Sequence, residues 1–269
     1  MKPAVTRRAI IRFDRGAIER VEDAIAVEGA LEIRVAGRTL SVTLRTPGHD
    51  AELALGFLAG EGLIGRREDV VSAVPAPAAC EDQADGIEIT LAAGVAMDWT
   101  RLERHFASTA ACGLCGRAHL ESLRAGLRPI ASGARYAPSA LAALPERLRV
   151  AQEAFTATGG LHAAAYCDPA LEPRVLREDV GRHNAVDKVA GWLLEQGRYP
   201  VDGGLLWVSG RAGAEIVLKA AKARIPLLAA VGAPSSLAVE LAEAAAMTLV
   251  GFLREGRMNV YCGEQRLSP

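Results

Sequence analysis

The chain has 269 residues, half of them hydrophobic, and a net charge of −1 at pH 7. This length and apolar content suffice to bury the core of one large domain or two small ones, which excludes global disorder. The near-neutral charge and an aromatic content of only 4% argue against nucleic-acid binding and against binding to an anionic membrane.

The N-terminal segment is charged throughout and contains no apolar run before a small-residue cleavage site, so it does not resemble a signal peptide. The longest stretch without a charge or a histidine is 225–239, which is too short and too interrupted by proline to span a bilayer. Five cysteines, an odd number, indicate a reduced cytoplasmic protein in which a close pair of thiols has a chemical role.

The N-terminal part of the chain predicts a small α+β unit. Residues 31–35 and 39–44 alternate apolar and polar side chains on either side of a turn, which predicts a hairpin. Asp50 is placed to cap a helix over 51–62, which glycines end. Farther on we expect short strands, the clearest of them over 86–92.

The middle of the chain is rich in small residues. Residues 108–116, STAACGLCG, surround two thiols with glycine and alanine and predict a mobile exposed loop, followed by a short helix over 118–126. Residues 126–138 contain glycine and two prolines, which indicates a linker or domain seam. Helical segments are expected over 141–155, with Pro145 opening the second of them.

The last hundred residues alternate apolar strands with helices, a pattern typical of an α/β fold. We therefore expect a mostly parallel sheet covered on both faces, with ligands at the carboxyl ends of the strands. The domain over 1–128 is the smaller α+β domain with the thiol loop, and 129–269 holds the layered sheet. The expected strands are 161–166, 203–210, 226–232 and 247–253, and the expected helices are 181–197, 212–223 and 235–245.

The strongest local motif is the pair Cys112 and Cys115 in CGLCG. Such a pair is compatible with half a zinc site, a dithiol redox centre, an inert packing pair or a nucleophilic thiolate. His119 offers one further ligand, but the sequence has no second C-x-x-C motif, so we expect no zinc. A nucleophile that visits two partners fits a mobile loop best, and Arg117 favours its thiolate form.

Polar side chains also gather where strands are predicted to end. His162 lies just inside a strand, where a hydrogen-bonded core histidine is a common alternative to a catalyst. Arg182, His183, Asn184 and Lys188 crowd a strand-to-helix junction, which indicates a polar pocket; the alternative is a solvated helix start capped by Asp179.

Two later junctions repeat this arrangement. Ser209 and Arg211 follow the next strand and place a cation beside a glycine that allows close approach to a phosphate. Arg254 and Arg257 flank a turn near the end of the chain, either as surface arginines of a hairpin or as part of the same pocket. Adjacent parallel strands would bring at least two of these segments to one edge of the sheet.

Taken together, these segments resemble one family over nearly the whole chain: the formate dehydrogenase accessory sulfurtransferases, or FdhD family. The residues that carry the resemblance are CGLCG, TGGLHAAA, EDVGRHNAVDK, SGRA-x-x-E, P-SSLAVELA and GF-R-x-x-RMNVY, in this order. The sequence departs from many members at Gly213 and Ala214, where they have a serine and an aromatic residue.

The resemblance implies a homodimeric sulfur carrier whose C-terminal part has a cytidine-deaminase-like fold. It implies that a cysteine desulfurase donates persulfide sulfur to Cys112, with Cys115 as helper. The sulfur would pass to the bis-molybdopterin guanine dinucleotide molybdenum cofactor of formate dehydrogenase, and GDP would mimic part of that cofactor. The residues expected to bind the cofactor are His162, Arg182, His183, Asn184, Lys188, Ser209, Arg211, Phe252, Leu253, Arg254, Glu255, Gly256 and Arg257.

Zinc-dependent deamination is one alternative to sulfur transfer. Zinc deaminases need a histidine, a glutamate two residues later, and then a C-x-x-C motif. Here Ala164 stands where that glutamate would be, and the cysteine pair precedes His162, so deamination is not expected. A thiol–disulfide oxidoreductase and a non-catalytic chaperone of the molybdenum cofactor remain as alternatives.

Overall fold

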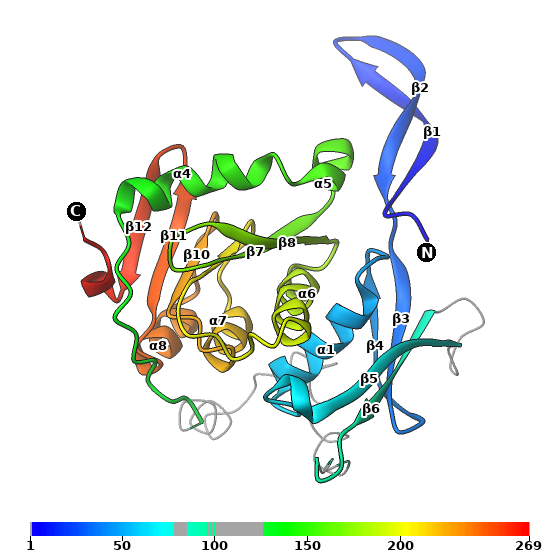
Figure 1. Cartoon of the computed structure of the whole chain (residues 1–269). Helices are drawn as coiled ribbons and strands as arrows, with labels where there is room; N and C mark the ends of the chain where they lie inside the picture. The colour runs from blue at the N-terminus through cyan, green and yellow to red at the C-terminus, as the bar shows by residue number, and fades with distance from the viewer. Residues whose placement is uncertain (1, 78–84, 96, 98, 100–125, 269) are drawn as a thin grey trace.

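The computed structural model describes residues 2–77, 85–95, 97, 99 and 126–268. The predicted thiol loop with Cys112 and Cys115, and nearly all of the predicted helix over 118–126, lie outside the described residues. The described chain forms a four-stranded sheet, a six-stranded sheet and a separate two-stranded ribbon (Figure 1).

The four-stranded sheet has the order β4-β3-β6-β5, and β3 and β4 form the predicted antiparallel hairpin. Its strands are β3 (Gly29–Val35), β4 (Arg38–Arg45), β5 (Val70–Pro77) and β6 (Asp85–Leu91), with a 3-10 turn, η1 (Arg67–Asp69), before β5.

Helix α1 (Asp50–Glu61) follows this hairpin, as predicted, and ends at Gly62 in the left-handed region. The prediction that Asp50 caps the helix is wrong, because the N-cap residue is His49 and its side chain makes no capping hydrogen bond. The carboxylate of Asp50 instead accepts two hydrogen bonds from the guanidinium of Arg45, at 2.9 and 2.8 Å.

A long ribbon precedes the first sheet, and it was not predicted. Strands β1 (Val5–Asp14) and β2 (Ala17–Ala26) pair only with each other in the described structure and project away from the body (Figure 1). The sequence shows no clear alternation here, because arginines and acidic residues stand on both faces of the ribbon.

The six-stranded sheet has the order β12-β11-β10-β9-β7-β8. The prediction of a mostly parallel sheet is wrong: β9, β10 and β11 are parallel to one another, whereas β7 is antiparallel to β8 and β9, and β12 is antiparallel to β11. Two hairpins, β7–β8 and β11–β12, cause the difference. The sequence analysis did not identify the first, and it offered the second only as one of two interpretations of Arg254 and Arg257. The strands are β7 (His162–Cys167), β8 (Pro173–Asp179), β9 (Leu205–Val208), β10 (Leu227–Ala230), β11 (Thr248–Arg254) and β12 (Arg257–Cys262).

Helices cover both faces of this sheet, as predicted (Figure 1). Leu205 and Trp207 of β9 pack with the face of α4, and Leu206 and Val208 pack in the cluster that includes α6, α7 and α8. The helices are α4 (Pro138–Arg149), α5 (Glu153–Thr158), α6 (Arg182–Glu195), α7 (Ala214–Lys222), α8 (Ser236–Ala244) and the 3-10 turn η2 (Glu264–Arg266).

Pro145 does not open a second helix, contrary to the prediction, but lies inside α4. Leu141, Leu144 and Leu148 are fully buried on one face of α4 on both sides of the proline. Their burial compensates for the backbone hydrogen bond that proline removes. None of the helices in the described ranges is long and apolar enough to cross a membrane.

The two halves of the chain meet where α1 crosses α6. A Cβ atom on Gly56 would lie 1.7 Å from the carbonyl oxygen of Asp187, and one on Gly191 would lie 1.8 Å from that of Glu52. Only glycine allows this approach, and the same apolar cluster contains Leu31 from one half and Leu228 from the other. The predicted boundary at residue 128 stays a prediction, although the two sides share this core.

We expect Gly56→Ala to lower the free energy of unfolding by at least about 3 kcal/mol, because the new methyl group would overlap a backbone oxygen that cannot move alone. Chemical denaturation measures this change. Gly133→Ala is the control, since a Cβ there would meet nothing within 4 Å, and it should change stability by less than about 1 kcal/mol. Equal effects of the two substitutions would refute the close helix crossing.

Candidate functional site

The candidate site is one edge of the six-stranded sheet, here called the carboxyl edge. It consists of the ends of β8, β9, β10 and β11 together with the start of β7, since β7 is antiparallel to both of its neighbours. His162 pairs with Asp179 in the register of β7 and β8. A Cβ on Gly210 would lie 3.4 Å from Nδ1 of His162 and 3.9 Å from Cδ of Arg182. The structure therefore brings together three of the predicted segments, around His162, Arg182 and Ser209.

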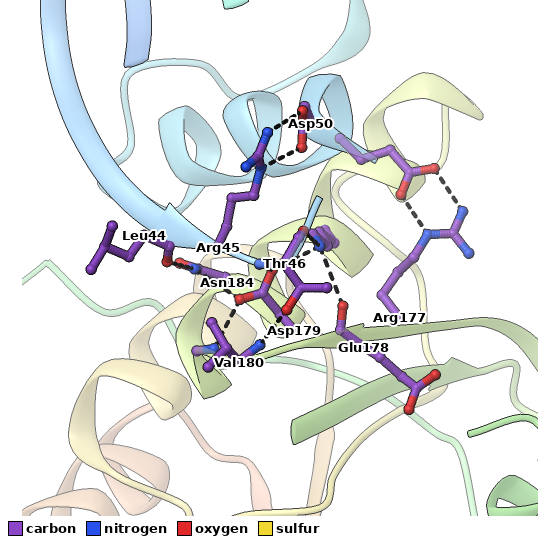
Figure 2. Close-up of polar contacts among 12 residues, drawn as sticks. Leu44, Arg45, Thr46, Asp50, Arg177, Glu178, Asp179, Val180 and Asn184 are labelled. Carbon is purple, nitrogen blue, oxygen red and sulfur yellow. Dashed lines mark hydrogen bonds and ion pairs between the residues drawn. The ribbon is translucent and has the colours of Figure 1, made fainter. Parts of the chain in front are cut away.

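A buried ion pair joins Asp179, at the end of β8, to Lys188 of α6. Figure 2 shows the polar contacts around Asp179. The ammonium of Lys188 lies 2.7 Å from the carboxylate of Asp179, and the two side chains are 1% and 0% exposed. Lys188 also donates hydrogen bonds to the carbonyl oxygens of Thr46, at 2.9 Å, and Glu178, at 3.3 Å. Lys188 was predicted to bind the cofactor; its ammonium is enclosed by these partners, so that contact stays a prediction.

Asp179 holds the start of α6 in place through further hydrogen bonds. Its carboxylate accepts from the backbone N–H of Gly181 at 2.8 Å, from the side-chain amide of Asn184 at 3.0 Å, and from the backbone N–H of Thr46 at 3.2 Å. The alternative interpretation, in which Asp179 is the N-cap residue of this helix, is wrong, because the N-cap residue of α6 is Gly181.

Asn184 is also a link between the two sheets, since its amide donates to the carbonyl oxygen of Leu44 at 2.8 Å. The sequence analysis did not identify Thr46 as part of this network. Thr46 contributes mainly through its backbone, whose N–H donates to Asp179 and whose carbonyl oxygen accepts from Lys188. Its hydroxyl also accepts a hydrogen bond from the N–H of Val180, at 3.1 Å. No side-chain pattern in the sequence signals such a role.

Two histidines at the carboxyl edge have a pKa below the ordinary value of histidine, which disfavours their charged form. Burial lowers the pKa of His183 to about 4, although its Nε2 lies 3.2 Å from the carboxylate of Glu215. Burial, with a smaller effect of the neighbouring Arg182, lowers the pKa of His162. Within the described structure, Nδ1 of His183 is buried without a hydrogen-bond partner. The histidines therefore offer hydrogen-bonding groups, and the arginines supply the positive charge.

The loops after β9 and β10 extend the sheet beyond its strands. The backbone N–H of Gly232 donates to the carbonyl oxygen of Gly210 at 2.9 Å, and that of Phe252 donates to Gly232 at 3.1 Å. A Cβ on Gly232 would lie 3.0 Å from that same oxygen of Gly210, so this position favours glycine. Ser209 accepts a hydrogen bond from the backbone of Ala163 at 2.9 Å, which fixes its hydroxyl against β7.

The predicted segment 252–257 comprises the end of β11, the turn at Glu255 and Gly256, whose φ angles are 51° and 69°, and the start of β12. Arg254 and Arg257 are directly opposite each other and both are exposed, a pairing of like charges that destabilises a hairpin. Arg257 pairs with Glu255 at 2.8 Å. An anion at this turn would relieve the remaining repulsion. Leu253 packs in the core, so its side chain is not available to a ligand.

The described cysteines are poor nucleophiles. Cys167 is fully buried, and burial raises the pKa of its thiol to about 12. Burial also raises the pKa of Cys262, whose sulfur lies 3.5 Å from the carbonyl oxygen of Met247. Among the described residues, no three His, Cys, Asp or Glu side chains gather closely enough to hold a metal ion. The predicted catalytic residues Cys112 and Cys115 lie outside the described residues.

Comparisons with known proteins give a consistent result. The model of the FdhD/NarQ family matches residues 26–268. The chain is 49% identical over 267 residues to the sulfur carrier protein FdhD of Mycolicibacterium paratuberculosis, covering 97% of this chain and 98% of the relative. It is 46% identical over 272 residues to the protein of that name from Streptomyces avermitilis, covering 97% and 95%.

A solved structure from Desulfotalea psychrophila, assigned as a formate dehydrogenase accessory protein, is similar to this chain. The match has a TM-score of 0.78 and covers 99% of this chain and 100% of the other. At 21% sequence identity, the likeness shows a shared fold. The mixed α/β architecture is thus common to both proteins.

We expect Lys188→Met to lower the free energy of unfolding by about 3–5 kcal/mol, because it leaves the carboxylate of Asp179 buried without its counter-charge. The measurement is chemical denaturation at pH 7. Adding Asp179→Asn to this variant should recover part of the loss, since the buried charge is then removed as well.

The control for this prediction is Arg147→Met. Arg147 pairs with Glu172 at 3.0 Å, but the side chains are 40% and 60% exposed. An exposed pair contributes less than about 1 kcal/mol. If Lys188→Met costs no more than this control, the buried pair does not support the carboxyl edge.

Proposed function

The chain belongs to the FdhD/NarQ family, and from this premise we propose that it is a sulfur carrier that serves formate dehydrogenase. The observation that carries the proposal is the similarity to relatives named sulfur carrier protein FdhD, which extends over almost the full length of both chains. The likeness of fold to a protein assigned as a formate dehydrogenase accessory protein supports the choice of client.

In the proposed charging step, a cysteine desulfurase presents a persulfide to Cys112. The thiolate of Cys112 attacks the outer sulfur of that persulfide, so that one S–S bond forms and the S–S bond of the donor breaks. The desulfurase cysteine leaves as a thiolate, and Cys112 becomes the persulfide. The reaction is an exchange with no net oxidation.

In the proposed delivery step, Cys115 acts as the helper. Its thiolate attacks the inner sulfur of the Cys112 persulfide, forms a Cys112–Cys115 disulfide and releases hydrosulfide to the molybdenum cofactor, which is the substrate. An external thiol then reduces the disulfide to restore both cysteines. This assignment uses the two thiols that the sequence places close together, whereas burial disfavours the thiolates of Cys167 and Cys262.

The cofactor proposed as acceptor, bis-molybdopterin guanine dinucleotide, has two nucleotide arms with pyrophosphate groups. Such groups require fixed positive donors and backbone N–H groups. The carboxyl edge offers Arg182 at the start of α6 and the glycine-containing loop at Ser209–Arg211. The paired guanidinium groups of Arg254 and Arg257 offer a second anion site at the turn.

The proposal also includes a homodimer and a cytidine-deaminase-like origin of the six-stranded sheet. Deamination is not part of it, because Ala164 replaces the glutamate that transfers protons in zinc deaminases, and that alanine is fully buried. Two other functions, a thiol–disulfide oxidoreductase and a non-catalytic cofactor chaperone, are distinguished by the experiment that follows.

We expect incubation with a cysteine desulfurase and cysteine to add one sulfur atom to the protein, located on the peptide that contains Cys112. Intact-mass and peptide-mass spectrometry under non-reducing conditions measure this addition. Cys112→Ala should abolish both the added mass and the activation of formate dehydrogenase. Cys115→Ala should retain the added sulfur but impair activation, since the helper thiol is missing.

Cys262→Ala is the matched control and should keep both the added sulfur and the activation, because burial disfavours its thiolate. A chaperone would show no added sulfur. An oxidoreductase would instead lose two hydrogens on oxidation without gaining sulfur. Full activation of formate dehydrogenase by Cys112→Ala would overturn the assignment of the carrier cysteine.

We expect GDP to bind the protein without added metal and more tightly than ADP. The affinity for GDP should fall as the salt concentration rises, because the recognised groups are charged. Arg254→Ala or Arg257→Ala should weaken binding about ten- to a hundredfold, the loss of a charge-assisted hydrogen-bond pair of roughly 1.5–3 kcal/mol. Arg257→Lys should not restore a bidentate contact. Titration calorimetry provides the affinities.

Arg174→Ala is the control for a general effect of charge. Arg174 lies near the start of β8, whereas Asp179 lies at the other end of this strand, on the carboxyl edge. Arg174 pairs with Asp168 at 3.7 Å. This variant should bind GDP like the parent. Parent-like binding by both turn variants, or equal affinities for GDP and ADP, would contradict a nucleotide site at the turn.

A further inference from the structure

An exposed carboxylate lies among the arginines of the carboxyl edge. Glu215 is the second residue of α7, which begins after the loop that follows β9, and its side chain is 54% exposed. The carboxylate of Asp179, at the end of β8, is by contrast fully buried. An exposed negative charge repels phosphate groups. Glu215 therefore disfavours a ligand that consists of phosphates alone.

The neighbours of Glu215 leave its charge uncompensated. One carboxylate oxygen lies 3.2 Å from Nε2 of His183, the second residue of α6. Burial lowers the pKa of His183 to about 4, which disfavours the charged form of this histidine. Within the residues that the structure describes, no lysine or arginine forms an ion pair with Glu215. The carboxylate is thus held in place by α6 and keeps its capacity to accept hydrogen bonds from a ligand.

Two exposed guanidinium groups lie close to this carboxylate. Arg182 directly precedes His183, and its Cδ would be 3.9 Å from a Cβ on Gly210. Arg211 follows Gly210 in the loop that leads to Glu215. In the described part of the chain, neither arginine has a hydrogen-bond or ion-pair partner. The carboxyl edge therefore presents free cationic donors and a free anionic acceptor side by side.

A matching ligand has acceptor oxygens in one part and hydrogen-bond donors in another. The phosphates of a nucleotide are such acceptors, and guanidinium groups bind them well. Guanine has adjacent donors, the N–H at N1 and the amino group at C2, and a carboxylate only accepts. Adenine has a lone pair at N1 and no amino group at C2, so the same carboxylate repels it. A group that repels phosphate can in this way select the base.

We propose that Glu215 is the residue that recognises guanine at the carboxyl edge. Its carboxylate accepts hydrogen bonds from N1 and from the amino group of the base, while Arg182 and Arg211 bind the pyrophosphate. This assignment rests on the proposed function, which supplies a guanine nucleotide as the ligand, and it adds the group that determines the preference for guanine. It also directs the nucleotide, with the base towards the α6–α7 contact and the phosphates towards the loop at Gly210.

The test is titration calorimetry of the full chain with GDP, IDP and inorganic pyrophosphate. IDP differs from GDP only in lacking the amino group at C2. The parent should bind GDP about tenfold more tightly than IDP, the effect of one charge-assisted hydrogen bond. Glu215→Gln should weaken GDP binding about tenfold or more and reduce the preference over IDP to less than about threefold. The same variant should bind pyrophosphate at least as tightly as the parent, because a repelling charge is removed.

Glu172→Gln is the matched control for loss of a carboxylate charge. The side chain of Glu172 is 60% exposed, similar to that of Glu215, and lies between β7 and β8 at the end of the sheet opposite the carboxyl edge. This variant should bind all three ligands like the parent.

A carboxylate in the first turn of a helix also stabilises that helix, and this role alone predicts the same loss for all three ligands in Glu215→Gln. A contact of Glu215 with the ribose predicts equal losses for GDP and IDP. Either result would overturn the recognition of guanine by Glu215 while leaving nucleotide binding intact. If the parent does not bind GDP at all, the nucleotide site of the proposed function is wrong, and this assignment with it.

Discussion

The buried ion pair between Asp179 and Lys188 is the constraint on which the arrangement of the carboxyl edge depends. A carboxylate with no exposure to water must keep all of its donors, because its solvation is otherwise lost. Those donors come from the connection after β4, from the turn after β8 and from α6. The pair therefore fixes these three segments relative to one another. Since β4 and β8 lie in different sheets, it also fixes the two sheets relative to each other.

The contacts of this ion pair also hold the residues of the carboxyl edge in place. The start of α6 cannot shift without breaking contacts to Asp179, so Arg182 and His183 emerge at fixed positions beside the loops after β9 and β10. Burial raises the pKa of Asp187 to about 6 even though its carboxylate lies 2.5 Å from the ammonium of Lys219. Charges are thus confined below the edge in close pairs, while the arginines at the surface remain available for an anionic ligand.

The sequence predicted the elements whose side chains carry a strong pattern. The β3–β4 hairpin alternates cleanly, and β9 and β10 are continuous apolar runs, so both were identified. Strand β8 was missed, and β12 was offered only as one arm of a possible hairpin, because each lies at an edge of its sheet, where one side faces water and polar residues such as Arg174 are tolerated. Pairing to β7 and β11 makes these segments strands, and pairing is not visible in a single sequence.

The candidate site was predictable at the level of segments but not of contacts. Polar residues at the predicted ends of strands indicated one edge, and the structure brings His162, Arg182 and Ser209 close together there. Nothing in the sequence showed that Lys188 points inward, because the residue type alone predicts exposure. Its partners are a carboxylate and two carbonyl oxygens, one of them 142 residues away, and tertiary folding alone brings them together.

The distribution of lysine and arginine shows how geometry divides the two cations in this chain. Only four of the 31 basic residues are lysines, and three of them hold neighbouring elements together: the buried Lys188 with Asp179, the half-buried Lys219 with Asp187, and the exposed Lys222 with the carbonyl oxygen of Gly60. An ammonium is compact and donates in three directions, so it fits between α1, α6 and α7 where glycines hold the helices close. The arginines instead form bidentate pairs with carboxylates, as Arg177 does with Glu52, or stand at the surface, as Arg254 and Arg257 do. Arginine serves the interior as well, since Arg45 is fully buried and binds Asp50 through two of its nitrogens. Forked donors therefore hold carboxylates inside the protein, and at the surface the same geometry is available to recognise phosphate.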